Sequence, residues 1–175
     1  MKQIRFALIL PMLVGAAACY STTGRPYKNV ESVSVRVFTN KTLYRDVDFQ
    51  ITDHLRREIS ALTPCTIGSP RKADAVFQGE VSDYAEVPEA IDEDEVVTAW
   101  RLTAKAAYKL VDNHTGKVIA SSAGVKWSEV YAVRTGRTLA EVREETLRKL
   151  AQRIVEQAFM PWPEAGASAG KRPQE

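Results

Sequence analysis

The sequence predicts an α+β fold in which two helices pack on one face of a four-stranded, mostly antiparallel sheet, in the order β-α-β-β-β-α. Three observations lead to this prediction. Four segments alternate apolar and polar residues as strands do, two segments repeat apolar residues with the period of a helix, and each segment has one apolar face. Packing the helices against the sheet buries all these faces together and leaves the other sheet face more polar and partly open.

The composition indicates one globular domain behind an exported N-terminus. The chain has 175 residues, of which 45% are apolar and 26% charged, as in an ordinary folded domain. Its net charge of +2 equals the contribution of Lys2 and Arg5, so the remainder is neutral, which argues against a nucleic-acid partner. We expect a signal peptide at 1–18, a lipidated linker at 19–30, one α+β domain at 31–160 and a disordered tail at 161–175.

The start of the chain has the three parts of a secretory signal peptide. A short basic segment is followed by an apolar stretch over 6–14, too short to span a bilayer, and by small residues up to Ala18. Cys19 comes next, so the site resembles a bacterial lipobox, in which this cysteine receives acyl chains. Ala16–Ala18 also fits an ordinary signal peptidase. Because Tyr20 rather than Asp follows the cysteine, the resemblance to Gram-negative lipoproteins implies the outer membrane.

The domain is predicted to open with a strand and a helix. The strand covers 33–38 and ends at Asn40, with three alternating valines on one face: Val33, Val35 and Val37. The helix is predicted over 44–62, with Asp46 and Asp48 in its first turn, where the helix dipole favours anions. Pro64 stops the helix. Its apolar stripe consists of Val47, Ile51, Leu55, Ile59 and Leu62.

Cys65 lies just after this helix. If Cys19 is acylated, Cys65 has no partner within the chain. We interpret it as a small, partly buried residue, and an intermolecular disulfide is the alternative.

The middle of the chain predicts a second strand and then an acidic loop. Residues 75–84 alternate, with Phe77 and Val81 on the apolar face. Residues 85–95 hold six acids and no base, but they lack the glycine and the ligand spacing of a calcium loop. We expect a solvated, mobile loop; a cation site or an acidic docking loop is the alternative.

A long hairpin and a second helix complete the domain. The even positions from Trp100 to Leu110 are apolar, and a turn cluster separates them from a segment with apolar odd positions at Ile119, Ala123, Val125 and Trp127. If Val111 faces Val118, the two apolar faces coincide. The further pairs in this register are Leu110 with Ile119 and Leu102 with Trp127. Thr138 and Glu141 then predict a capping box for a helix that continues up to Pro161.

The residues that enzymes and metal sites need are scarce. Neither His54 nor His114 has a cysteine or paired carboxylate at ligand spacing, and we expect both side chains to face solvent. No nucleophile elbow, phosphate-binding glycine loop or Cys-x-x-Cys motif occurs. We therefore predict a protein that is not an enzyme and that has no catalytic residue, metal or cofactor.

One group of bases is a candidate binding site. Between residues 96 and 126 there are five bases and one acid. In the predicted register four of the bases share the face opposite the helices, with Lys126 across from Thr103; they are Arg101, Lys105, Lys109 and Lys126. Such a cluster suits a phosphorylated ligand, because Lys and Arg donate charge-assisted hydrogen bonds to phosphate oxygens. The alternative is a solvated outer face whose lysines discourage aggregation.

Several segments together resemble the lipopolysaccharide-assembly lipoprotein family, LptE. They are V-S-V-R-V-F-T-N-K-T at 33–42, I-T-D-H-L at 51–55, A-D-A-V-F-Q-G at 73–79 and T-G-K at 115–117, in this order after Cys19. The resemblance implies a two-layer, non-enzymatic lipoprotein anchored by its acyl chains at the periplasmic face of the outer membrane. It also implies that the chain plugs an LptD-like β-barrel and helps lipopolysaccharide reach the cell surface.

A second resemblance leads to a different class. The opening strand followed by an amphipathic helix is also similar to outer-membrane lipoproteins that activate penicillin-binding proteins or form curli-secretion-like pores. Such a protein would bind a periplasmic enzyme or assemble with itself. Affinity isolation from membranes separates the two, because the first class brings down a large outer-membrane barrel.

Overall fold

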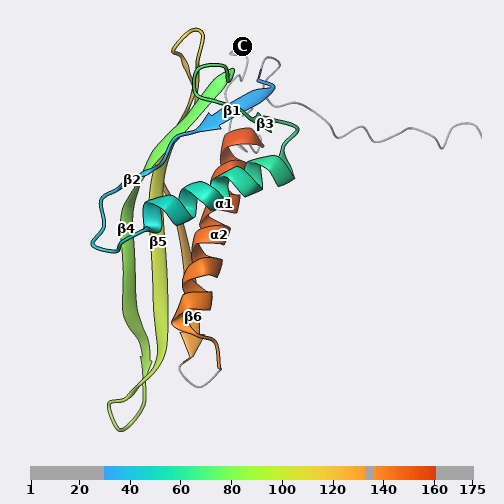
Figure 1. Ribbon diagram of the computed structural model, residues 1–175. Coiled ribbons are helices and arrows are strands. Elements are labelled where there is room, and N and C mark those ends of the chain that lie inside the picture. Colours follow the sequence, from blue (N-terminus) through green and yellow to red (C-terminus); the bar gives the residue numbers. More distant parts are fainter. Residues whose placement is uncertain (1–29, 133–135, 161–175) are drawn as a thin grey trace, which may run out of the picture.

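The computed structural model describes residues 30–132 and 136–160. Both helices lie on the same face of one sheet, and the central strands continue beyond the helices (Figure 1). The predicted α+β class is confirmed. The predicted signal peptide, Cys19 and the C-terminal tail lie outside the described residues. In chain order the elements are β1 (Ser32–Val35), β2 (Thr39–Asn40), α1 (Val47–Leu62), β3 (Thr66–Ile67), β4 (Ala75–Ile91), β5 (Val97–Asp112), β6 (Val118–Ala132) and α2 (Leu139–Phe159).

The sheet has six strands rather than the predicted four. Its order is β3-β1-β4-β5-β6, and β2 also pairs with β4. The long strands β4, β5 and β6 run antiparallel, whereas β1 pairs with β3 and β4 in parallel, as β2 does with β4. The two additional strands, β2 and β3, have two residues each, and so short a segment shows no alternation in the sequence.

The predicted apolar face of the first strand is wrong at its end. Val37 is 47% exposed, whereas Phe38 is 2% exposed. Val35 faces Phe77 and Thr39 faces Glu80, so the β1–β2 segment has one more residue than the β4 segment it follows. Because strand side chains alternate with a period of two, one extra residue exchanges the inward and outward positions.

Helix α1 begins three residues later than predicted. A hydrogen-bonded turn holds the preceding segment, since Asn40 Oδ1 accepts from Thr42 N at 2.8 Å and Asn40 Nδ2 donates to the carbonyl of Tyr44 at 2.6 Å. Asp46 then has φ 63°, which is left-handed, and no helix can include it. The helix ends at Leu62, as predicted. Cys65 is buried, 3.5 Å from the carbonyl of Val30, in agreement with the first interpretation of this cysteine.

The predicted acidic loop is wrong, because most of it belongs to β4. This strand continues to Ile91, and the chain reverses within 92–96. Two of the acids have partners on other strands of the sheet: Glu86 accepts a hydrogen bond from Tyr131 on β6, and Glu89 binds Arg101 on β5. Cross-strand partners therefore allow acidic residues to remain in a strand that β-propensity alone would end here.

The β5–β6 hairpin begins in the predicted register and then departs from it. Val111 faces Val118, but Leu110 faces Ala120 and Leu102 faces Glu129. Two irregularities, each adding one residue to β6, cause this change. Their combined shift is two residues, so the apolar positions Val125 and Trp127 still face the helices, as predicted.

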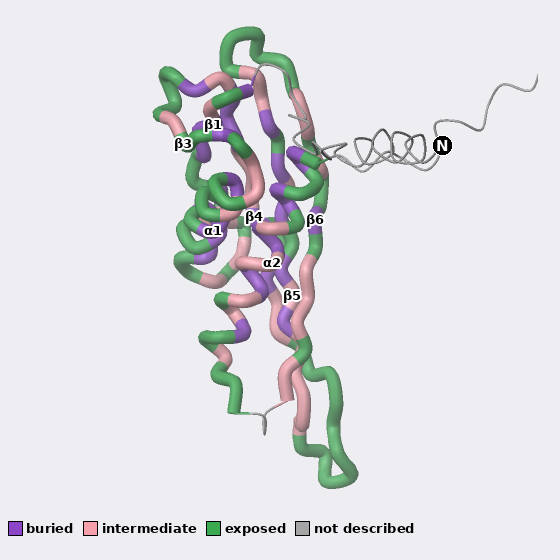
Figure 2. The backbone as a smooth tube through the Cα atoms, turned by 90° about the vertical axis from the view of Figure 1, so that its right-hand side faces the viewer, coloured by how far each residue is buried: buried purple, intermediate pink, exposed green. Residues whose placement is uncertain are grey.

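The core lies between the sheet and the two helices (Figure 2). Phe77 on β4 is fully buried at its centre, with ring centroids 5.3 Å from Tyr108 on β5 and 6.2 Å from Phe159 on α2. The predicted capping box of α2 is confirmed, because the Thr138 side chain accepts from Glu141 N at 3.2 Å and the Glu141 carboxylate accepts from Thr138 N at 2.7 Å. None of the described helices is long and apolar enough to cross a membrane.

Candidate functional site

Three of the four predicted bases lie together on the outer face of the sheet, away from the helices. Lys105 and Lys109 occupy odd positions of β5, whose even positions from Leu102 to Leu110 are buried under the helices, and both lysines are exposed. Lys126 on β6 is exposed and faces Lys105. We call Lys105, Lys109 and Lys126 the lysine cluster. Among the described residues, none of the three forms an ion pair with a carboxylate.

The predicted position of Lys126 opposite Thr103 is wrong. Thr103 faces Ser128, and their hydroxyl oxygens are 2.9 Å apart. The two extra residues in β6 bring Lys126 opposite Lys105 instead. Like charges directly opposite each other repel, so this register concentrates positive potential at one point of the sheet. Asp83, on the other side of Lys105, offsets part of it.

Arg101 lies on the same outer face but forms an ion pair with Glu89. Its Nε donates to Glu89 Oε2 at 2.7 Å, and a second guanidinium nitrogen donates to the other carboxylate oxygen. This hydrogen bond raises the pKa of Arg101 and lowers that of Glu89. The bidentate pair leaves Arg101 less available to a ligand than the lysine cluster, a difference that residue types alone do not reveal.

A groove of about 570 Å³ lies beside the lysine cluster on the same face. Small residues, among them Ala107 and Ala123, line it, and Arg36 and Lys109 contribute its bases. Its one acid, Glu80, is held by Lys41 at 2.7 Å. The groove thus combines two uncompensated cations with hydroxyl groups, a chemistry that suits a phosphorylated or acidic ligand. The lining hydroxyls come from Thr39, Ser121 and Ser122.

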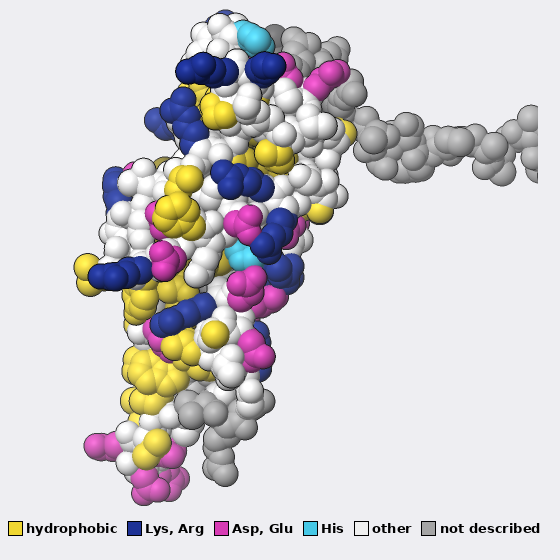
Figure 3. Space-filling model, in the orientation of Figure 1, with side chains coloured by type: hydrophobic (Ala, Val, Ile, Leu, Met, Phe, Trp, Pro, Cys, Tyr) yellow, Lys and Arg dark blue, Asp and Glu magenta, His cyan; other side chains and the backbone are white. Residues whose placement is uncertain are grey.

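Acids collect at the far end of the molecule. Figure 3 shows them at the tip of the β4–β5 hairpin, below a hydrophobic region, while the bases lie higher. The tip carries Asp92, Glu93, Asp94 and Glu95, all exposed. Several large apolar side chains near it are also exposed; they are Val87, Ile91, Val96 and Val130, at 45–60%. The tip therefore carries acids without bases, whereas acids and bases are mixed over the rest of the face that Figure 3 shows.

The two histidines have different environments. His114 is exposed in the β5–β6 turn, as predicted, with Nε2 3.7 Å from a carboxylate oxygen of Asp74. The prediction for His54 is wrong, because its side chain is buried between α1 and α2 with Nε2 3.5 Å from Glu144 Oε1. The apolar stripe of α1 faces the sheet, but α2 covers the neighbouring flank that carries His54. Burial lowers the pKa of His54, and the nearby Glu144 offsets part of this effect.

We expect the stability of the domain to fall between about pH 6.5 and 5, the range in which an unfolded histidine gains its proton. The folded chain resists that proton because the pKa of His54 is lowered. As the pH falls, the unfolded state binds the proton before the folded state does. The free energy of unfolding therefore falls by up to about 1.4 kcal/mol per pH unit. Urea unfolding from pH 7.5 to 5 should show this slope, and His54→Gln should remove it. Parallel pH profiles for the two proteins would contradict the assignment.

Asp74 is a structural residue that sequence reasoning missed. Its Oδ2 accepts hydrogen bonds from Glu31 N at 3.1 Å, Ser32 N at 2.9 Å and Ser32 Oγ at 2.8 Å. These bonds lower the pKa of Asp74 and join the start of β1 to the start of β4. The available signal was an acid between the two alanines of the A-D-A-V segment at the start of a buried strand.

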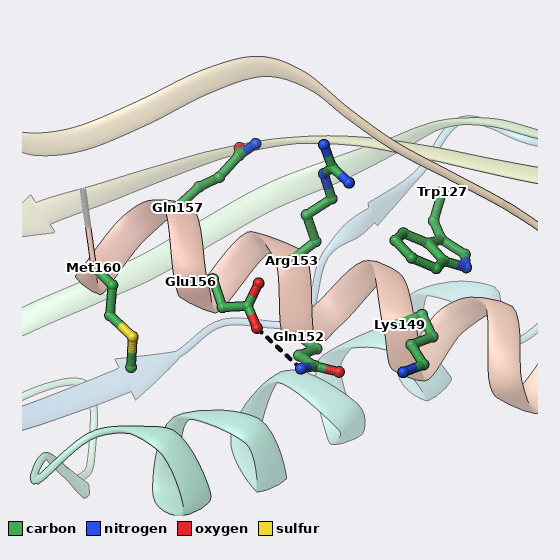
Figure 4. Close-up of a pocket in the computed structure, with 7 residues that line it drawn as sticks. All are labelled: Trp127, Lys149, Gln152, Arg153, Glu156, Gln157 and Met160. Atoms are coloured by element: carbon green, nitrogen blue, oxygen red, sulfur yellow. Dashed lines mark hydrogen bonds between the residues drawn. The ribbon is translucent and has the colours of Figure 1, made fainter. Parts of the chain in front are cut away.

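The described residues show no metal-binding geometry. Within 30–132 and 136–160, no three His, Cys, Asp or Glu side chains converge. A second groove, of about 600 Å³, lies between β6 and α2; Figure 4 shows Trp127 extending from the sheet toward the helix, with Arg153 beside it. This groove was not predicted, because its bases lie on the polar face of a helix, and the sequence does not distinguish that face from ordinary solvated surface.

Comparison with known proteins places the chain in a family. A family model described as "LptE: Lipopolysaccharide-assembly" matches residues 30–160. No curated protein sequence matches the chain.

Solved structures share the fold at low sequence identity. A PelC variant dodecamer from Paraburkholderia phytofirmans is 15% identical with a TM-score of 0.54, covering 78% of this chain and 96% of that one. The uncharacterized lipoprotein B of Nitrosomonas europaea is 19% identical with a TM-score of 0.54, covering 74% and 83%. A Xanthomonas campestris protein is 10% identical with a TM-score of 0.55, covering 78% and 87%.

Proposed function

Because this chain belongs to the LptE lipopolysaccharide-assembly family, we propose that it is an outer-membrane lipoprotein that helps deliver lipopolysaccharide to the cell surface. In this proposal Cys19 carries the acyl chains, and the domain sits on the periplasmic face and plugs an LptD-like β-barrel. The chain acts by binding and positioning, not by catalysis. The family match over residues 30–160 is the observation that carries the proposal.

The outer sheet face supports a role in contact with lipopolysaccharide. The helices cover one face of the sheet, so the opposite face, with the lysine cluster and the groove beside it, is the exposed one (Figure 1). The phosphates of lipid A are anionic and would accept hydrogen bonds from Lys105, Lys109 and Lys126. A local cluster of this kind provides attraction without a generally cationic surface, in accord with the neutral remainder of the chain.

The partner is tested by affinity isolation of the full-length, membrane-anchored protein. We expect a large outer-membrane β-barrel to be recovered in a defined ratio, and Cys19→Ser to reduce that recovery by removing the anchor. Recovery of a cell-wall synthase, or of a ring of this chain alone, would instead support the second class considered from the sequence and would contradict the barrel assignment.

The ligand site is tested by charge reversal. Lys105→Glu with Lys126→Glu should weaken binding of lipopolysaccharide at least tenfold and reduce the salt dependence of binding, because two attractive contacts become repulsive. The control is Arg71→Glu with Lys72→Glu, an equal change of charge on an exposed loop before β4. Equal weakening by both pairs, or unchanged binding in the Lys105/Lys126 variant, would contradict a specific site.

A further inference from the structure

The sheet ends on one side in a long strand. Strand β6 lies at the end of the strand order and pairs with β5 alone among the described residues. The opposite edge, β3, has two residues, whereas β6 has 15. Folded proteins protect their sheet edges by keeping edge strands short, or by placing prolines, bulges or several charges there. The β3 edge follows this rule.

The second half of β6 does not follow it. Residues Val125–Ala132 pair without interruption with Ala99–Ala106, so the strand is regular over eight residues. The segment V-K-W-S-E-V-Y-A contains no proline or glycine, and its one lysine and one glutamate cancel. Valine, tryptophan and tyrosine are among the best strand formers. Along residues 125–131 this edge therefore presents an ordered row of backbone donors and acceptors for another strand.

Helix α2 forms the inner wall beside that edge. Residues 149, 152, 153, 156, 157 and 160 form one stripe of the helix and, with Trp127, line the groove of about 600 Å³ (Figure 4). Strand side chains alternate between the faces of a sheet. A further strand beside β6 would therefore direct every second side chain into the groove between the sheet layer and α2.

The chemistry of the groove indicates which side chains fit it. The Arg153 guanidinium lies over the Trp127 ring at 5.9 Å, and Lys149 is nearby. The one acid, Glu156, accepts a hydrogen bond from Gln152 at 2.9 Å. Trp127 is itself held, because its Nε1 donates to Glu129 at 2.8 Å. The groove thus offers a fixed aromatic surface and two bases, Arg153 and Lys149, neither of which forms an ion pair with a carboxylate among the described residues.

We propose that the β6 edge binds an extended acidic segment of a partner protein, which adds to the sheet as a strand along residues 125–131. One inward side chain of that segment is apolar and packs against Trp127. Another, two residues away, is a carboxylate that binds Arg153 or Lys149. The site is separate from the lysine cluster, which belongs to the outer face, and does not depend on the function proposed above.

The test uses the full chain and synthetic 12-residue peptides that alternate valine and threonine. Glutamate replaces the residue at every second position whose side chain would face the groove. Hydrogen exchange should show protection of β6 amides when the peptide binds, at peptide concentrations up to millimolar. Arg153→Glu should weaken binding about tenfold, and a peptide with lysines in place of the glutamates should recover binding to that variant. Arg57→Glu, an exposed charge reversal on α1, should have no effect.

Other results would overturn the proposal. Three results would each exclude strand addition at this edge. The peptide could protect amides outside β6 from exchange, or a peptide with two central prolines could bind equally well. The third is equal affinity of the peptide for Arg153→Glu and for the unchanged chain. Protection of β6 without peptide that rises with protein concentration would show that a second copy of the chain occupies the edge. Protection that disappears when residues 161–175 are removed would assign it to the chain's own C-terminal segment.

Discussion

Phe77→Ala is expected to lower the free energy of unfolding by about 3–5 kcal/mol, the range for removing a fully buried aromatic ring. Phe77 is 0% exposed and lies where β4, β5 and α2 meet. Its ring stacks on Phe38, Tyr108 and Phe159 at centroid distances of 6.2, 5.3 and 6.2 Å. The substitution leaves a cavity bounded by three aromatic rings, and large rings are poorly able to close it by small movements.

This loss is a large fraction of the total stability of a single domain, which is about 5–15 kcal/mol. Urea unfolding followed by circular dichroism measures it. The control is Phe49→Ala, because Phe49 is 60% exposed on α1 and its removal should change stability by less than about 0.5 kcal/mol. If both variants lose the same stability, the core is not centred on Phe77.

Phe77 also shows what the sequence could predict. Its inward direction follows from the alternation of 75–84, and the faces of both helices follow from their stripes. Such predictions succeed because burial of one face repeats over many residues. They fail where one residue changes the pattern: the extra residue between β1 and β2 turns Val37 outward, and the two in β6 bring Lys126 opposite Lys105.

The candidate site was predicted in residue type but not in geometry. The prediction that Lys105 and Lys109 share the outer face required the strand period and nothing more. The ion pair between Glu89 and Arg101 forms only because β4 continues through the acidic segment. Strand propensity does not favour this continuation, so the sequence did not predict the pair. His54 was expected in solvent because the apolar stripe of α1 does not include it, yet tertiary packing against α2 buries it.

Gly79→Ala is expected to destabilise the domain by about 1–3 kcal/mol or more, the range for overpacking a core. A Cβ at this position would lie 2.3 Å from the carbonyl oxygen of Ala107 and 2.6 Å from the ring of Phe38. The carbonyl belongs to the paired strand β5, and the ring is 2% exposed, so neither can move away without disturbing the sheet or the core. Unfolding in urea measures the loss.

Gly124→Ala is the matched control for this effect. Its Cβ would lie 2.5 Å from Lys105 Cε, as close as the contacts at Gly79, but the obstructing atom is near the end of an exposed, flexible side chain. Lys105 can move to another rotamer at little cost. We therefore expect stability to change by less than about 0.5 kcal/mol, and lipopolysaccharide binding to change if the position of Lys105 matters. Equal destabilisation by both alanines would show that the closeness of the contact, rather than the mobility of the obstructing group, determines the cost.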